Sequence, residues 1–192
     1  LGLSAAAAAW TIWEQKFNSG AIGPEWSQTF PERIAIAGRA VWFYLGKLLW
    51  PEPLIFIYPR WTIAAGLDVG HVGLIAIGAM LAVFAWRRWH AGMLVALYFG
   101  ALLFPVLGFF SVYFFRYSFV GDHFQYLASI GPLGLMGAAL ARLPARIAGA
   151  VGAAALLALG LVTARQTAAY ANNEALWRHT LVRNPAAGVA AT

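Results

Sequence analysis

Long apolar runs separated by short polar turns dominate the pattern of this chain. Four runs, of about 20 residues each, are long enough to cross a membrane as helices; they lie at 67–86, 91–115, 124–141 and 147–164. A further apolar run at 1–13 has no initial Met and no basic stretch before it. We therefore expect it to be the end of a longer helix rather than a signal peptide, and the chain to be a fragment. The pattern predicts an all-α membrane protein with about five transmembrane helices, the first truncated.

The stretch 31–50 departs from this pattern because Arg39, Lys47 and several aromatic residues interrupt its apolar positions. A Pro followed by Glu32 favours a helix start, and Pro51 marks its end. Two interpretations remain. The helix either lies in or dips into the membrane interface, which we favour, or crosses the bilayer and reverses the direction of the first span.

Composition supports lipid as the surroundings of much of the chain. Hydrophobic residues make up 61% and charged residues only 10%, against about 25% charged in soluble domains. The net charge of +6 is spread over loops, which fits contact with membrane lipids and argues against nucleic-acid binding. The chain has no Cys, so disulfides and thiolate metal sites are excluded.

Two short basic turns predict the orientation. The turns at 87–90 and 142–146 contain Arg but no carboxylate, which is typical of cytoplasmic loops. The seven acidic residues then fall on the opposite side, together with the segment 165–192. Within that segment YANNEALWRHTLVRNP predicts an amphipathic helix, with Trp177 and Leu181 on one face to pack against a following repeat.

Three blocks occur in an order that resembles a known family. They are WFYLGKLLWPEPLIFIYPRW at 42–61, GDHFQYLASIG at 121–131 and EALWRHTLVRNP at 174–185. The chain resembles bacterial relatives of the transmembrane and tetratricopeptide repeat-containing proteins, which are similar to GT-C glycosyltransferases. In the family's D-R-Y-x-Y-L-P block, this chain keeps the Asp, the second Tyr and the Leu. It has His123, Phe124 and Ala128 in place of Arg, Tyr and Pro.

The resemblance implies a multi-pass protein of the bacterial inner membrane. Residues 1–164 would form a GT-C-like transmembrane region, and 165–192 would begin a periplasmic array of tetratricopeptide-like repeats. The implied activity is transfer of a sugar, with mannose as the family's example, from a polyprenyl-phosphate donor to a protein or glycan acceptor. A protein acceptor would be bound by the repeats, since a single repeat cannot bury its apolar face alone.

The resemblance also suggests where a site would lie. The family's catalytic acid is expected in a first outward loop, which would precede Leu1, so no catalytic residue is assigned in this chain. Several polar residues are predicted to face the outward side and bind the donor phosphate. These candidates are Arg116, His123, Lys47, Arg60 and Tyr58, with Asp122, Asp68 and His71 as orienting groups, and Asp122 as the partner of Arg116.

Each of these residues also has a structural explanation. Lys47 and Arg60 can extend to lipid headgroups. Asp68 and His71 can form the polar end of a span, which we favour over a role as base, and Arg116 with Asp122 can tie down a loop. The His residues lack zinc-ligand spacing, and no dinucleotide or Walker loop is present, so we expect no metal and no cofactor besides the lipid-linked substrate.

Two functions of different classes remain open. The first is a membrane-embedded glycosyltransferase. The alternative is a non-catalytic membrane anchor that displays tetratricopeptide-like repeats for assembly of envelope complexes, with an O-antigen-ligase-like protein as a weaker third option. An acidic residue in the outward loop before Leu1 would favour the enzyme.

Overall fold

The described residues of the chain are all-helical. In the computed structural model these are residues 10, 13–14, 23–64 and 66–190, and no strand occurs among them. The α-helices are α2 (Phe30–Leu49), α3 (Val69–Trp86), α4 (His90–Leu103), α5 (Ile130–Leu140), α6 (Ala145–Thr167) and α7 (Asn173–Arg183). Short 3-10 helices lie between them: η1 (Pro24–Trp26), η2 (Phe104–Val106), η3 (Tyr113–Arg116), η4 (Asp122–Gln125), η5 (Ala168–Tyr170) and η6 (Pro185–Ala190).

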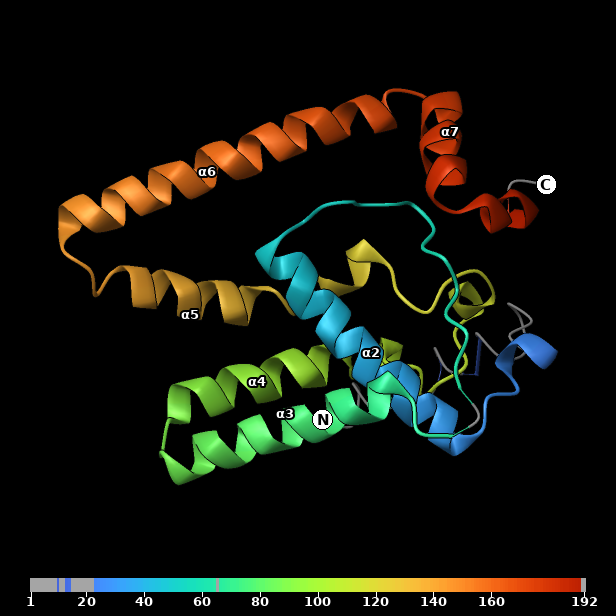
Figure 1. Cartoon of the computed structure of the whole chain (residues 1–192), viewed down its shortest axis with the longest axis horizontal. Coiled ribbons are helices and arrows are strands. Elements are labelled where there is room, and N and C mark those ends of the chain that lie inside the picture. Colours follow the sequence, from blue (N-terminus) through green and yellow to red (C-terminus); the bar gives the residue numbers. More distant parts are fainter. Residues whose placement is uncertain (1–9, 11–12, 15–22, 65, 191–192) are drawn as a thin grey trace.

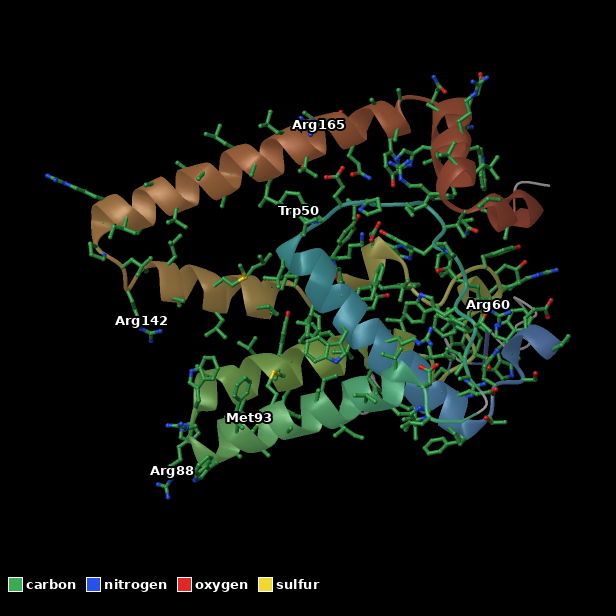
Figure 2. All side chains as sticks on the ribbon, in the orientation of Figure 1. Trp50, Arg60, Arg88, Met93, Arg142 and Arg165 are labelled. Carbon is green, nitrogen blue, oxygen red and sulfur yellow. The ribbon has the colours of Figure 1, made fainter. Side chains whose placement is uncertain are left out.

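The long helices form two hairpins whose turns lie at the same end of the molecule. Figure 1 shows the α3–α4 hairpin and the α5–α6 hairpin, both extending to the left, with α2 crossing obliquely between them. The turns carry Arg88 and Arg142, which Figure 2 labels at that end. The 3-10 helices and α7 gather at the opposite end, which we call the loop end. The two basic turns therefore share one side, as the orientation argument requires.

Two helices are long and apolar enough to cross a membrane. They are α3 and the stretch Ala145–Tyr170, in which α6 continues into η5. At 1.5 Å per residue, the 18 residues of α3 extend about 27 Å and the 26 residues of the second stretch about 39 Å, against about 30 Å for the hydrocarbon core. Their side chains are mostly exposed; Ile75 is 69% and Leu156 74% exposed. Such surfaces are costly in water and are of the kind that suits contact with lipid.

The prediction of about five spanning helices is met only in part. The run 91–115 forms a helix only to Leu103, after which Pro105 lies in η2 and the chain turns irregular. Proline lacks the N–H that would continue an α-helix. The run 124–141 is shorter still, because residues before Ile130 form η4 and turns, leaving an α-helix of 11 residues. The expected first span, 1–13, lies largely outside the described residues.

Helix α2 forms where the sequence predicts it. Its first turn is fixed by the Glu32 carboxylate, which accepts the backbone N–H of Thr29 at 2.7 Å, and the helix ends before Pro51. Gly38 and Gly70 let α2 approach α3 closely: a Cβ at Gly38 would lie 1.9 Å from the carbonyl oxygen of Gly70. This contact sets the angle at which α2 crosses the hairpins and so positions the residues at its two ends.

The C-terminal residues form one α-helix followed by the 3-10 helix η6. Asn172 caps α7 by accepting the N–H of Ala175 at 2.8 Å. Trp177 was expected to pack on a following repeat, but here its ring meets Phe56 edge-on, with centroids 5.9 Å apart. From residue 171 on, the described residues contain one α-helix, α7, and no helix pair.

Candidate functional site

A carboxylate bound to an arginine fixes the start of α3. The Asp68 carboxylate accepts hydrogen bonds from Nε and Nη2 of Arg39 at 2.8 and 2.6 Å. It also accepts the backbone N–H groups of Gly70 at 2.8 Å and Ala64 at 3.3 Å. Burial raises the pKa of Asp68, but the hydrogen bonds from Arg39 and the backbone outweigh it and lower the pKa to about 2. An ionised, fully bonded carboxylate of this kind favours the structural interpretation over a catalytic base.

His71 joins the same network from the first turn of α3. Its Nδ1 accepts the backbone N–H of Asp68 at 3.0 Å. Its Nε2 lies 3.0 Å from the carbonyl oxygen of Pro31 at the start of α2. These partners require a neutral imidazole with the hydrogen on Nε2. Both candidate residues of this region thus tie α2 to α3.

A second polar group lies at the loop end and includes three predicted residues. The Tyr58 hydroxyl lies 2.9 and 3.1 Å from the two carboxylate oxygens of Asp122, to which it donates. The Lys47 ammonium lies over the Tyr58 ring, 5.4 Å from its centroid, and over the Phe43 ring at 5.6 Å. It donates to the carbonyl oxygen of Pro53. We call Lys47, Tyr58 and Asp122 the Asp122 cluster.

The two charged groups of the Asp122 cluster are both partly withdrawn from water. Burial raises the pKa of Asp122, although the hydrogen bond from Tyr58 and the charges of Lys47 and His123 act in the opposite direction. Burial also lowers the pKa of Lys47, and the charges of Asp122 and Glu52 partly offset this. Fields between charges are stronger where water is displaced, so a charged ligand would interact strongly with this cluster.

Helix α2 and the segment before α3 hold the cluster in place. Tyr44 is completely buried, at 0% exposed, and its hydroxyl accepts the backbone N–H of Gly121 at 3.2 Å, next to Asp122. Tyr44 and Lys47 lie three residues apart on α2, so they are neighbours on its surface. The helix thereby positions both the cation and the backbone that carries the acid.

The proline-rich segment 51–59 carries Tyr58 and is fixed by α6 and α7. Gln166 at the end of α6 donates to the carbonyl oxygen of Leu54 at 2.8 Å. Asn184, at the end of α7, donates to the carbonyl oxygen of Ile57 at 3.1 Å and is buried. Side-chain bonds to backbone carbonyls fix a segment that has no regular structure of its own.

The remaining predicted cations lie around Glu25 in η1. The Arg60 guanidinium donates to the Glu25 carbonyl oxygen and lies over the Phe119 ring, 4.8 Å from its centroid. The Arg116 Nε is 4.0 Å from the Glu25 carboxylate. At that distance, and with both side chains more than one-third exposed, the ion pair contributes little.

The structure brings together some of the predicted residues and separates others. Lys47, Tyr58 and Asp122 meet, as described. Asp122 was expected to pair with Arg116, but it pairs with Tyr58 while Arg116 faces Glu25. The two residues lie on separate 3-10 helices, Arg116 at the end of η3 and Asp122 at the start of η4.

Two predicted residues line different cavities. His123 lines an aromatic cavity of about 480 Å³ together with Trp177 and Phe114. Arg60 lines a separate, polar cavity of about 510 Å³. The described residues contain no group of three or more His, Cys, Asp or Glu that could hold a metal ion.

Sequence reasoning missed three residues that build the site. Tyr44, Asn184 and Glu25 were not among the predicted candidates. The position of Tyr44 one turn before Lys47 was an available signal, whereas the contact of Asn184 with Ile57 spans 127 residues and has none.

Comparison with known proteins adds no assignment to this geometry. No model of a protein family matches the chain, and neither a curated protein nor a solved structure matches it.

Proposed function

We propose that this chain is part of a membrane-embedded glycosyltransferase of the GT-C-like type, which takes a sugar from a polyprenyl-phosphate donor outside the cytoplasm. The observation that carries the proposal is the Asp122 cluster, in which the Tyr58 hydroxyl donates to Asp122 and the Lys47 ammonium lies over the Tyr58 ring. An ammonium group has three N–H donors, and among the described residues Lys47 has one hydrogen-bond partner, the carbonyl of Pro53. Two donors remain for phosphate oxygens.

The cluster has the chemistry to hold a phosphate group. Lys47 would donate charge-assisted hydrogen bonds to the phosphate, while the Tyr58 hydroxyl keeps its hydrogen bond to Asp122. A phosphate near Asp122 raises the pKa of that carboxyl further, since like charges disfavour ionisation. Phosphate binding is therefore coupled to proton uptake by Asp122.

The remaining steps follow from the resemblance. The bond between the sugar C1 and the phosphate oxygen would break and release polyprenyl phosphate, while an acceptor oxygen bonds to C1 and gives up its proton to a general base. Residues 165–192 would begin the repeats that present the acceptor. In this proposal the protein is a multi-pass protein of the bacterial inner membrane with these repeats in the periplasm.

The proposal is tested by donor binding to the chain in lipid nanodiscs. Undecaprenyl-phosphate mannose and undecaprenol differ in the phosphate and sugar but share the lipid tail. We expect the phosphorylated donor to bind at least about 10-fold more tightly, which corresponds to about 1.4 kcal/mol. Equal binding of both lipids by folded protein would refute the site and favour the anchor for repeats.

A further inference from the structure

An apolar cavity of about 600 Å³ lies among α2, α3, α4 and α5. Every residue in its lining is apolar, and none belongs to the Asp122 cluster. Along α4 the lining extends from Gly92, in the first turn, to Phe104, directly after the last turn. The cavity therefore follows the whole of α4, and its volume lies within the range of about 300–1,000 Å³ found for small-molecule sites.

This cavity is suited to a hydrocarbon chain. It is partly open at the protein surface, and the helices around it expose apolar side chains such as Leu94 of α4, at 70%. Water finds no hydrogen-bond partners in an apolar lining, and an empty cavity leaves its wall atoms without dispersion contacts. A flexible hydrocarbon chain supplies these contacts, and Met80 and Met136 in the lining can adapt to its shape.

One end of the cavity lies beside the basic turn at 87–90. Phe84 and Gly92, which flank this turn, both line the cavity. The Trp89 ring meets the Phe84 ring edge-on with centroids 4.7 Å apart, and a Cβ at Gly92 would lie 2.4 Å from the Trp89 ring. Trp89 is nevertheless 44% exposed. Partly exposed Trp residues are typical of the membrane–water interface, which places this end of the cavity at the level of lipid headgroups.

The charge at this end of the cavity favours an anion. Arg87 and Arg88 are exposed, and neither forms an ion pair with a carboxylate among the described residues. The sequence has no acidic residue between Asp68 and Asp122. Helix α4 begins in the same turn, and its N-cap residue, Trp89, makes no side-chain cap hydrogen bond. The first N–H groups of α4 and the positive end of its dipole add to the attraction for an anion.

The second basic turn adds charge of the same sign. Figure 2 shows Arg88 and Arg142, one from each turn, at the same end of the molecule. Arg146 follows in the first turn of α6, whose N-cap residue, Pro144, also makes no side-chain cap hydrogen bond. The residues from 123 to 173, which include this turn, contain no carboxylate side chain.

We propose that an anionic phospholipid binds here, with one acyl chain in the cavity and its phosphate at Arg87, Arg88 and the start of α4. A zwitterionic lipid brings an ammonium group, which the two arginines repel. A soluble phosphate ester has no chain to fill the cavity. A bound chain packs α5 against the α3–α4 hairpin, since all three helices line the cavity. The site uses no residue of the Asp122 cluster, so it is independent of donor binding there.

The test is native mass spectrometry of the chain in an uncharged detergent, titrated with dioleoyl phosphatidylglycerol or dioleoyl phosphatidylcholine. The two lipids have the same acyl chains and differ in headgroup charge. We expect phosphatidylglycerol to bind about 30-fold more tightly, which corresponds to about 1 kcal/mol for each arginine. Arg87→Gln combined with Arg88→Gln should lower this preference to less than about threefold. Arg178→Gln combined with Arg183→Gln, which removes two charges from α7, should leave the preference unchanged.

A second pair of variants tests the position of the acyl chain. Gly100 lines the cavity, and a Cβ there meets no atom within 4 Å, so Gly100→Leu can fill part of the cavity. It should weaken phosphatidylglycerol binding about 10-fold by displacing part of the chain. Gly78→Leu is the matched control, because a Cβ at Gly78 is equally unobstructed but Gly78 does not line the cavity. This control should bind phosphatidylglycerol as tightly as the wild type.

Three results from folded protein would overturn the inference. They are equal affinity for the two lipids, a preference that survives the loss of both arginines, and equal affinity of Gly100→Leu and Gly78→Leu for phosphatidylglycerol. Undecaprenol serves as a competitor, since it has a long hydrocarbon chain and no charge. If equimolar undecaprenol displaces the phosphatidylglycerol, the cavity belongs to the donor's lipid tail and the inference is wrong.

Discussion

Replacement of Gly38 by Ala should destabilise the protein by disrupting the crossing of α2 and α3. The new Cβ would lie 1.9 Å from the carbonyl oxygen of Gly70 and 3.1 Å from a side-chain carbon of Leu74. Even weak C–H···O contacts are about 3.3–3.6 Å long, so the helices must separate by more than 1 Å. Because the Gly70 oxygen belongs to the backbone, no side-chain rotation relieves the overlap. We expect a loss of about 3 kcal/mol, at the upper end of the range for overpacking.

Gly46→Ala is the matched control on the same helix. A Cβ at Gly46 meets no atom within 4 Å, and Ala is favoured over Gly in a helix interior by about 1 kcal/mol. Both variants carry the same replacement, but we expect Gly38→Ala to lower the free energy of unfolding and Gly46→Ala to raise it. Thermal unfolding of both variants in nanodiscs measures the difference. If Gly38→Ala is as stable as Gly46→Ala, the close crossing of α2 and α3 is wrong.

Three further predictions test other parts of the structure. Asp68→Asn should lower the free energy of unfolding at neutral pH by about 2 kcal/mol, because the pKa of Asp68 is lowered to about 2. In the wild type this contribution is present above pH 3.8 and is lost as the pH falls toward 2. A variant whose stability falls over this pH range as steeply as that of the wild type would contradict the prediction. Since the chain has no Cys, a Cys placed at Arg88 should resist an impermeant thiol reagent in intact cells while one at Asn173 reacts, and labelling of both from outside would refute the orientation. Asn172→Ala should destabilise α7 by about 1 kcal/mol through loss of its cap, as measured by hydrogen exchange of that helix, and unchanged exchange would argue against the cap.

The helices that could be predicted are those whose signals are local. The apolar runs at 67–86 and 147–164 became α3 and α6 with small shifts of their ends. The stretch 31–50 became α2 because its Glu32 and Pro51 act within one turn of its ends. Such signals depend on neighbouring residues, so the sequence contains them in full.

The lengths of α4 and α5 could not be predicted from hydropathy. Residues 107–115 and 124–129 belong to apolar runs but fold as bends, turns and 3-10 helices, and Leu107 and Phe115 there are buried against the rest of the protein. Hydropathy does not distinguish burial in protein from exposure to lipid, since both favour apolar side chains. That ambiguity led to expected spans at 91–115 and 124–141 that are too long.

The candidate site shows the same division between local and long-range information. Lys47 and Tyr58 lie close in sequence, and both were identified as candidates. The partners of Asp122 and Arg116 depend on how η1 and the segment 51–59 fold back over the loop end, and their contacts span as many as 91 residues, as between Arg116 and Glu25. Charge and spacing identify which residues need partners, but not which partners they find.

The most direct test of the proposed donor site is the affinity of Lys47→Gln for undecaprenyl-phosphate mannose in nanodiscs, normalised to folded protein. The loss of a charge-assisted hydrogen bond, about 1.5–3 kcal/mol, should weaken binding by roughly 10- to 150-fold. Arg178→Gln is the control, because it also removes one positive charge but lies exposed on α7, paired with Glu174. Wild-type affinity should fall as the pH rises through the titration of Asp122, and Asp122→Asn should remove this dependence. If Lys47→Gln and Arg178→Gln bind the donor as tightly as the wild type, Lys47 does not hold the phosphate and the account is wrong.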